Sequence, residues 1–285
     1  MKNVIITGAN SGLGFETAKK IARDHAFRVI LACRNEAKAA RAKADIISAT
    51  GNGQIDTMKL DTSSLASVRA FANAFIERYG TVDVLINNAG ISPMRESGVT
   101  EEGFEVVFAT NYLGHFLLTQ LLLPYFSANG RILNVTSDMH NPPFGELVWK
   151  GVDILAHPTE EVMRERYYYS KLCNLYFVYE LARRLEAEGR GIRVNAFNPG
   201  MMQTNFAPVD KARAAMVKLT MPKRFGDLEK SSDAYAELVV NDALAVTSAN
   251  YYDRSTTAIK SSELSYDMEN AKELWEASER LCGLK

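Results

Sequence analysis

The stretch that decides the fold lies near the start of the chain and reads Thr7-Gly8-Ala9-Asn10-Ser11-Gly12-Leu13-Gly14. It follows a short apolar run and opens into a segment with helical spacing. Glycines at such a place allow a tight turn and close approach of the backbone to a pyrophosphate, and the helix N-terminus supplies free N–H groups. Glycines before helices also serve ordinary turns. Their position between a first strand and a first helix predicts a dinucleotide-binding turn.

Short apolar runs alternate with amphipathic segments along most of the chain. The expected strands lie at 4–7, 28–33, 54–59, 82–87, 130–136 and 192–198. The expected helices lie at 14–24, 36–50, 65–79, 104–126 and 167–189. This alternation predicts right-handed βαβ units, and the continuous apolar runs predict strands buried on both faces. We therefore expect an α/β fold, a single doubly wound Rossmann-type domain over 1–285, with a mostly parallel, about seven-stranded sheet and helices on both faces.

The bulk composition argues against several classes of protein. The net charge of -1, with lysines and arginines spread along 285 residues, does not predict a nucleic-acid partner. The longest apolar stretch, 116–126, is short and contains Thr119, Gln120 and Pro124, so we expect no membrane span and a cytoplasmic protein. The three cysteines show no metal-ligand spacing, so no metal is expected.

Two segments interrupt the alternation and leave the carboxyl ends of expected strands, where ligands of open α/β sheets bind. They span about 139–166 and 201–227, and we expect both to cover the substrate. Their large apolar side chains are Phe144, Val148, Trp149, Met201, Met202, Phe206, Met216 and Phe225. Such walls predict a small-molecule substrate that is bulky and apolar. The alternative is that these side chains only pack the segments onto the body of the protein.

The end of the second expected strand bears on the choice of cofactor. An NAD-binding chain usually places an acid there to bind the ribose 2′-hydroxyl. Here the chain reads Ala32-Cys33-Arg34-Asn35, and the first acid is Glu36. The Arg34 guanidinium could bind a 2′-phosphate, with neutral contacts from Asn10 and Ser11, which predicts NADP(H). The alternative is that Arg34 is a solvated residue at the start of a helix.

A Tyr-x-x-x-Lys pattern lies on the last of the expected helices. Tyr167 and Lys171 are four residues apart and share one helix face. A phenol titrates near pH 10, and a neighbouring ammonium should lower that pKa, which suits acid-base chemistry near neutrality. Tyr168 is three residues before Lys171 and could also approach it. Tyrosines on apolar helix faces are often only part of the core, so the pattern needs support from elsewhere.

That support comes from a resemblance. The spacing Gly-x-x-x-Gly-x-Gly at 8–14 resembles the short-chain dehydrogenase/reductase family, and the likeness continues at 60–61, 87–90, 110–114, 134–137 and 198–200. It implies catalytic roles for Asn111, Ser137, Tyr167 and Lys171. Tyr167 would be the acid/base, Ser137 would hold the substrate oxygen, and Asn111 would hold a water that links Lys171 to solvent. The cofactor-binding residues would be Gly8, Asn10, Ser11, Gly12, Leu13, Gly14, Arg34, Asn35, Leu60, Asp61, Asn88, Ala89, Gly90, Tyr167, Lys171, Pro199, Gly200, Met202 and Thr204.

One departure narrows the resemblance. Ser137 and Tyr167 lie 30 residues apart, whereas the family usually spaces them by about a dozen. That longer spacing, together with 32–35, 114–118 and 274–284, resembles the branch of retinol dehydrogenases and light-dependent protochlorophyllide reductases, and Asn88-Ala89-Gly90 favours the former. The implied function is NADP(H)-dependent hydride transfer between nicotinamide and a carbonyl or alcohol. The alternatives are a catalytically inactive nucleotide-sensing regulator and a light-dependent tetrapyrrole reductase. A homodimer through helices 104–126 and 167–189 is possible.

Overall fold

A single sheet of eight strands forms the centre of the protein, in the order β3-β2-β1-β4-β5-β6-β7-β8. The computed structural model describes residues 1–92, 97–157, 164–202, 219–244 and 246–285. All neighbouring strands are parallel except β7 and β8. The strands are β1 (Lys2–Thr7), β2 (Phe27–Cys33), β3 (Ile55–Lys59), β4 (Val82–Asn87), β5 (Phe126–Val135), β6 (Arg193–Asn198), β7 (Tyr251–Asp253) and β8 (Ala258–Ile259). The predicted Rossmann-type sheet is confirmed, with one short antiparallel strand added at its edge.

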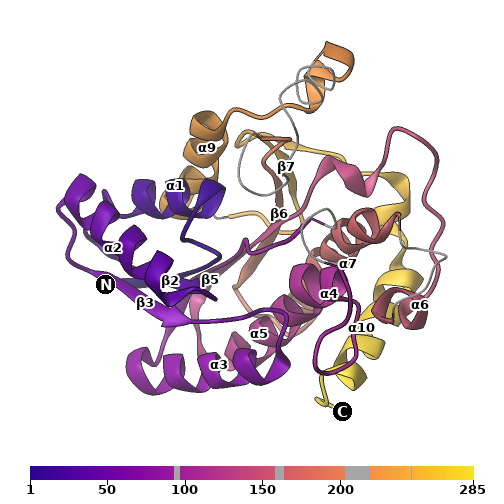
Figure 1. Cartoon of the computed structure of the whole chain (residues 1–285), viewed down its shortest axis with the longest axis horizontal. Helices are drawn as coiled ribbons and strands as arrows, with labels where there is room; N and C mark the ends of the chain where they lie inside the picture. Colours follow the sequence, from indigo (N-terminus) through magenta and orange to yellow (C-terminus); the bar gives the residue numbers. More distant parts are fainter. Residues whose placement is uncertain (93–96, 158–163, 203–218, 245) are drawn as a thin grey trace.

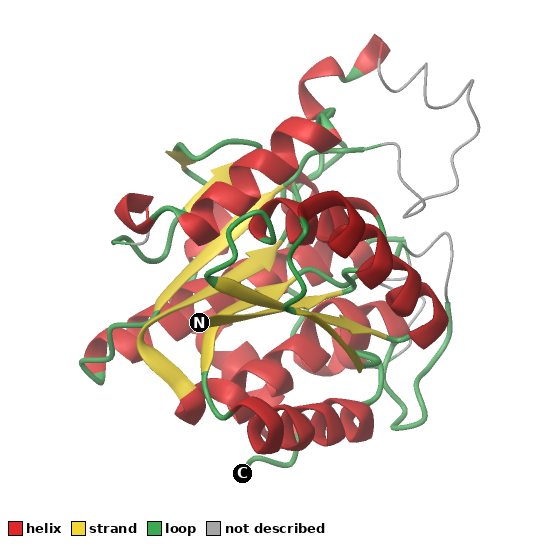
Figure 2. Ribbon diagram, turned by 90° about the vertical axis from the view of Figure 1, so that its left-hand side faces the viewer, coloured by secondary structure: helices red, strands yellow, loops and turns green. Residues whose placement is uncertain are grey.

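Helices cover both faces of this sheet (Figures 1 and 2). One layer contains α1 (Gly12–Ile21), α2 (Glu36–Thr50) and α9 (Leu228–Val240). The other contains α3 (Leu65–Tyr79), α5 (Gly114–Leu122), α7 (Arg166–Ala187) and α10 (Met268–Leu281). Successive side chains of a strand point to opposite faces. In β1, accordingly, Val4 and Ile6 pack with the first layer and Ile5 packs with the second.

The sheet order places a switch point between β1 and β4. The chain winds outward from β1 through β2 to β3, then returns to β4 and winds the other way. The register aligns Ile6 with Ile86, and Asn87 with Asn134, so the carboxyl ends of β1, β4 and β5 meet at one edge. In open α/β sheets this crevice is the place where ligands bind.

The stretch expected as one helix at 104–126 has a more complex form. It consists of α4 (Val106–Phe108), a π-helical turn η1 (Ala109–Leu113), α5 and a 3-10 turn η2 (Leu123–Tyr125). Gly114 at the start of α5 lies against the chain after β3, where an added Cβ would be 1.9 Å from the Thr62 carbonyl oxygen. π-helical turns are rare and often occur at functional sites.

The same stretch corrects the expectation about membrane-spanning length. Among the described residues, Val106–Tyr125 is one helical segment that is long and apolar enough to cross a bilayer. Of its most apolar window, 78% is buried inside the protein. Phe116 and Leu117 in its centre are fully buried in the core between α3 and α7. Its apolar character is therefore explained by packing within the domain.

The two segments expected to cover the substrate are only partly described. The first contains the 3-10 turn η3 (Asp138–His140) and α6 (Val152–Ala156), and the second contains the 3-10 turn η4 (Pro222–Arg224). Residues 158–163 and 203–218, and with them Thr204, Phe206 and Met216, lie outside the described residues. The 3-10 turns η5 (Asp242–Leu244) and η6 (Glu263–Tyr266) complete the C-terminal part.

Candidate active site

The glycine-rich turn after β1 is tied to the turn after β4 by a dense set of hydrogen bonds. Thr7 Oγ1 accepts from the backbone N–H groups of Asn88 and Ala89, at 2.9 and 2.8 Å. The Asn88 side chain donates to the Thr7 carbonyl at 2.7 Å. Gly8 has a φ of +67°, and a Cβ on Gly14 would lie 2.5 Å from Asn88 Nδ2. The predicted positions 7–14 and 87–90 therefore form one structure.

The N-terminus of α1 differs from those of the next two helices in the chain, α2 and α3. Asn35 caps α2 and Ser64 caps α3, each by accepting a backbone N–H hydrogen bond in its side chain. Ser11 at the N-cap of α1 makes no such bond, and the first turn of α1 has no acidic residue. Uncapped N–H groups at a helix N-terminus bind anions well. This turn fits the pyrophosphate of a dinucleotide.

The predicted 2′-phosphate residue lies beside the predicted adenine residues. Arg34 follows β2 and forms an ion pair with Asp61, with 4.0 Å between Nη1 and Oδ2. Leu60 is buried, and its N–H donates to the Cys33 carbonyl at 3.1 Å. Asn35 uses its side chain to cap α2. A shallow hollow at the start of α1 and on α2 is lined by Asn10, Ser11, Phe15, Lys38, Arg41, Ala42 and Asp45. Lys38 and Arg41 add positive charge to this hollow and Asp45 adds one negative charge.

Ser137, Tyr167 and Lys171 come together in the structure as the resemblance implied. The Tyr167 hydroxyl is hydrogen-bonded to the Ser137 side chain, across the gap between β5 and α7. The Lys171 ammonium lies 5.5 Å from the centroid of the Tyr167 ring. Its Nζ donates to the Val135 carbonyl at 3.2 Å. Tyr168 packs partly against the core and meets the Tyr167 ring edge-on, with 6.5 Å between ring centroids. The Tyr169 hydroxyl donates to the Val148 carbonyl at 2.8 Å and so points away from Ser137.

The electrostatics of this cluster correct one expectation. Burial raises the pKa of Tyr167 above its ordinary value, and the hydrogen bond from Ser137 only partly offsets this shift. The sequence predicted the opposite, namely that the Lys171 ammonium would lower the pKa of Tyr167. Burial also lowers the pKa of Lys171 to about 8, because desolvation disfavours the charged form. The phenol is therefore held as a proton donor at neutral pH.

Asn111 lies in the π-helical turn η1 and points toward the same cluster. Its side chain donates to Ser170 Oγ and to the Ile91 carbonyl, both at 3.1 Å, and accepts from the Ile91 N–H at 2.8 Å. Ser170 in turn donates to the Tyr167 carbonyl at 2.7 Å. Asn111 therefore connects the chain after β4 with the first turn of α7. Its role in holding a water stays a prediction.

Two buried histidines support the site and were missed in the sequence. His115 lies between Thr7 Oγ1, at 2.9 Å from Nε2, and the Asn111 carbonyl, at 3.2 Å from Nδ1. His140 Nδ1 lies 2.6 Å from the Ser137 carbonyl, and its Nε2 accepts from the Ser262 N–H at 3.1 Å. Burial lowers the pKa of both, to about 4 for His115. Each has one partner within four residues, but the second partner, Thr7 for His115 and Ser262 for His140, lies more than 100 residues away, so no local pattern in the sequence marks either histidine.

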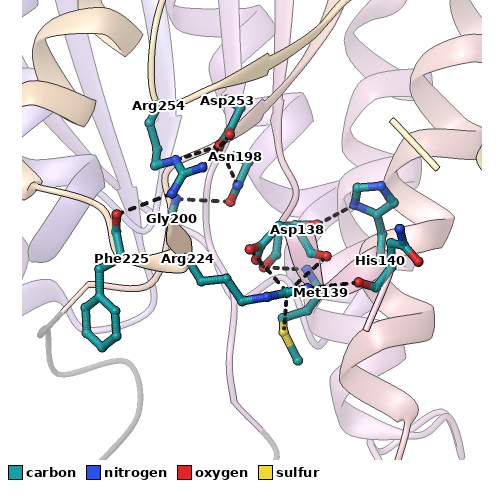
Figure 3. A network of polar contacts seen from close by, with 11 residues as sticks. Asp138, Met139, His140, Asn198, Gly200, Arg224, Phe225, Asp253 and Arg254 are labelled. Atoms are coloured by element: carbon teal, nitrogen blue, oxygen red, sulfur yellow. Dashed lines mark hydrogen bonds and ion pairs between the residues drawn. The ribbon is translucent and has the colours of Figure 1, made fainter. Parts of the chain in front are cut away.

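The predicted positions after β6 lie at the same edge of the sheet. Asn198 accepts from the Gly200 N–H at 3.0 Å and donates to Asp253 at 2.8 Å. Gly200 has a φ of +76°, and an added Cβ would lie 2.7 Å from Arg254 Cδ (Figure 3). Met202 packs against the core beneath α1 and α9. Thr204 cannot be placed, since it lies outside the described residues.

One predicted wall residue faces elsewhere. Trp149 donates to Glu273 of α10 at 2.7 Å and meets Tyr176 edge-on, with 5.3 Å between ring centroids. It packs the first covering segment onto the body, which was the alternative reading. Phe144 and Val148 are 79% and 64% exposed, so they stay available to a ligand.

The fold and the arrangement of these residues define a dinucleotide-binding oxidoreductase, and comparisons with known proteins agree. A family model described as short chain dehydrogenase matches residues 2–148. Human retinol dehydrogenase 13 is 38% identical over 295 residues, which cover 100% of this chain and 85% of that protein. The chain belongs to the short-chain dehydrogenase family, whose members use nicotinamide cofactors and act on alcohols or carbonyls.

Solved structures give the same fold. The 3-ketoacyl-(acyl-carrier-protein) reductase from Brucella melitensis, complexed with NADH, is 26% identical with a TM-score of 0.68, over 90% of this chain and 97% of that chain. An actinorhodin polyketide ketoreductase with NADPH is also 26% identical, with a TM-score of 0.67, over 90% and 96%.

Proposed function

We propose that the protein is an NADP(H)-dependent carbonyl reductase or alcohol dehydrogenase with Tyr167 as its acid/base. One observation carries this proposal, namely the hydrogen-bonded Tyr167 and Ser137 with Lys171 beneath the phenol ring. Ser137 follows β5, and Tyr167 and Lys171 lie on α7. The end of β5 belongs to the same edge of the sheet as the glycine-rich turn after β1. A regulator without chemistry would have no need of a buried ammonium beside a buried phenol, whose desolvation is costly.

In the proposed reaction, the nicotinamide supplies or accepts a hydride at the substrate carbon when it is bound. During reduction, the Tyr167 phenol donates its proton to the carbonyl oxygen, and the Ser137 hydroxyl donates a hydrogen bond to the same oxygen. The Lys171 ammonium stabilises the resulting phenolate and holds the nicotinamide ribose. With a pKa of about 8, Lys171 stays mostly charged at neutral pH yet can pass on a proton. Asn111 would hold the water that returns a proton to this pair.

The preference for NADP(H) rests on the residues of this chain, because one similar structure holds NADH and another NADPH. The guanidinium of Arg34 is 55% exposed and lies next to Asp61, where the adenine ribose would bind. The nearby hollow is lined by Lys38 and Arg41 together with Asp45, which adds two cationic groups and one acid near the expected 2′-phosphate. Charge-assisted hydrogen bonds to a phosphate favour NADPH over NADH.

We further propose a bulky, largely apolar aldehyde, ketone or alcohol as substrate. Phe144 and Val148, in the segment after β5, and Met201, after β6, are exposed and would give a ligand apolar contact. Retinol dehydrogenases are among the relatives, which suggests retinal as a first probe.

The test is a screen of the purified full chain with NADPH and with NADH against retinal, nonanal, acetophenone, lactate and glucose-type sugars. We expect turnover of apolar carbonyls, with a kcat/KM for NADPH at least ten times that for NADH. Turnover restricted to hydroxy acids or sugars would refute the substrate proposal. Turnover with NADH alone would refute the cofactor proposal.

A further inference from the structure

The residue that follows the candidate catalytic serine in the chain forms an ion pair. Asp138 follows Ser137 in the chain, and its Oδ2 lies 3.2 Å from Nη1 of Arg224, which is 86 residues away (Figure 3). Both side chains are about three-quarters buried. The pair joins η3, which follows β5, to η4, which precedes α9. The proposed reaction assigns no role to Asp138 or Arg224.

The hydrogen-bond capacity of Ser137 makes this pair relevant. A serine hydroxyl has one hydrogen to donate. Ser137 Oγ donates a long hydrogen bond to Asp138 Oδ1 at 3.3 Å, accepts from the Met139 N–H at 3.2 Å and is hydrogen-bonded to the Tyr167 hydroxyl, so the Asp138 carboxylate already competes weakly for the serine hydrogen. If the Asp138 carboxylate came closer, it would take the hydrogen that the substrate oxygen needs. A carboxylate is the stronger acceptor of the two, so its distance from Ser137 matters.

Arg224 is held firmly enough to control that distance. Its guanidinium also donates to the Asn141 carbonyl and lies against Met139 Sδ, both at 3.3 Å. Its backbone carbonyl accepts from the Met201 N–H at 2.7 Å, in the chain that follows β6. Arg224 thus connects the strand end that carries Gly200 with the turn that carries Ser137.

We propose that Arg224 is a positioning residue that draws the Asp138 carboxylate away from Ser137, so that the Ser137 hydroxyl hydrogen stays available to the substrate oxygen. This inference rests on the proposed function, because it assigns Ser137 a donor role in that reaction. The atoms involved keep their protons throughout, and only the acceptor of one hydrogen bond changes.

Within the described part of the chain, Arg224 is the cation that forms an ion pair with the Asp138 carboxylate. Asp138 is felt electrostatically by Tyr167 on α7, by His140 in its own turn, and by Tyr251 and Arg254 at β7. Burial keeps His140 and the two tyrosines from carrying charge near neutral pH. Arg254 is bound to the Asp253 carboxylate. Without Arg224, the Asp138 charge would therefore be left to Ser137 and would oppose ionisation of Tyr167.

The first test is structural and needs no substrate. In crystals of the full-length Arg224→Met variant, we expect the Ser137 Oγ to Asp138 Oδ distance to shorten from 3.3 Å to about 2.7 Å, an ordinary O–H···O bond. A distance that stays above 3 Å would overturn the inference, as would an Asp138 side chain that turns into solvent. This result stands even if wild-type protein reduces none of the tested carbonyls, which would refute the proposed function instead.

The second test is kinetic, with NADPH and the best carbonyl of the screen. Arg224→Met should lower kcat by about 10- to 100-fold, a loss in the range expected for weakening one donor to the reacting oxygen, with little change in the KM for NADPH. Its pH profile for reduction should shift toward higher pH, because the unpaired carboxylate disfavours the phenolate. Asp138→Asn in the Arg224→Met background should restore most of kcat, since the amide is neutral and competes less for the hydrogen.

The control is Arg184→Met, which removes an arginine of similar exposure, 29% against 21% for Arg224, from an ion pair with Glu180 on α7. It should lower stability without changing kcat. A purely structural role for Arg224 would make it behave like this control, and Asp138→Asn would then fail to rescue it. Either of these two outcomes would overturn the inference.

Discussion

The two sides of the site are built by different means. On the cofactor side, the glycine turn, the α1 N-terminus and the turn after β4 are joined mostly through backbone groups of neighbouring strand ends, such as the N–H groups of Asn88 and Ala89, which donate to the Thr7 hydroxyl. On the substrate side, side chains far apart in the sequence hold Ser137 in place. The Asp138–Arg224 pair spans 86 residues, and the bond from Ser262 to His140 spans 122.

Because of this difference, the two sides of the site should tolerate different amino-acid substitutions. The cofactor side depends on glycines at a few positions and on two short polar side chains, those of Thr7 and Asn88. Scaffolds of buried side chains can change shape and polarity by single substitutions, so that one binding edge can serve a fixed cofactor and a variable substrate. His115 joins the two sides, because it contacts both Thr7 and the Asn111 carbonyl.

The largest effect should come from the substrate side, where the reacting proton lies. Tyr167→Phe should lower kcat by about 10²–10⁴-fold, the usual contribution of a general acid, while the Kd for NADPH changes little. Tyr168→Phe removes the same atom from the adjacent residue and should cost far less. If Tyr168→Phe were inactive and Tyr167→Phe active, the assignment of the acid would have to move by one residue.

His115, which contacts both sides of the site, should make the free energy of unfolding depend on pH below neutrality. The pKa of His115 is about 4 in the fold, against an ordinary 6.5, because burial disfavours the imidazolium. Below pH 6.5 the unfolded chain takes up the proton first, so the free energy of unfolding should fall as the pH drops from 6.5 to 4. The total loss from this group is about 3 kcal/mol.

Urea unfolding at pH 7 and pH 4.5 measures this effect. His115→Asn should be less stable than wild type at pH 7 but should lose clearly less stability between the two pH values. The control is His25→Asn, at an exposed position, which should keep the pH dependence of wild type. Equal pH dependence in wild type and His115→Asn would contradict the prediction.

On the cofactor side, the preference for NADPH over NADH should depend on one side chain, that of Arg34. Arg34→Ala should weaken NADPH binding by about ten- to a hundredfold and leave NADH binding nearly unchanged, since a charge-assisted bond contributes about 1.5–3 kcal/mol. Fluorescence titration with both nucleotides measures this. Arg78→Ala is the matched control, because Arg78 is equally exposed at 56% and also pairs with an aspartate. Equal losses for NADPH and NADH in Arg34→Ala would remove the basis for the proposed preference.

The backbone scaffold itself should respond to a single methyl group. In Gly14→Ala the new Cβ would lie 2.5 Å from Asn88 Nδ2 and 3.0 Å from the Gly8 carbonyl oxygen, so α1 must shift away from the turn. We expect a loss of about 1–3 kcal/mol in the free energy of unfolding, and weaker binding of NADPH and NADH alike. Gly53→Ala, where nothing lies within 4 Å, should change stability by less than about 1 kcal/mol. Similar effects of both substitutions would show that close packing at Gly14 is unimportant.

The sequence by itself determined the class of fold and the position of the glycine-rich turn. Both follow from local rules: apolar runs of strand length, helical spacing between them, and glycines at a strand-to-helix turn. The helices at 36–50 and 65–79 have the predicted bounds, because Asn35 and Ser64 are caps that act within three residues. Tyr167 and Lys171 were also readable, since one helix turn separates them.

Only the tertiary structure decided the rest. It showed that Trp149 packs on α10, that the helix at 104–126 contains a π-helical turn, and that burial raises the pKa of Tyr167. It also paired Asp138 with Arg224 and placed His115 and His140 beneath the site. Desolvation and long-range pairing depend on which surfaces meet after folding, and no spacing within a single chain segment encodes them.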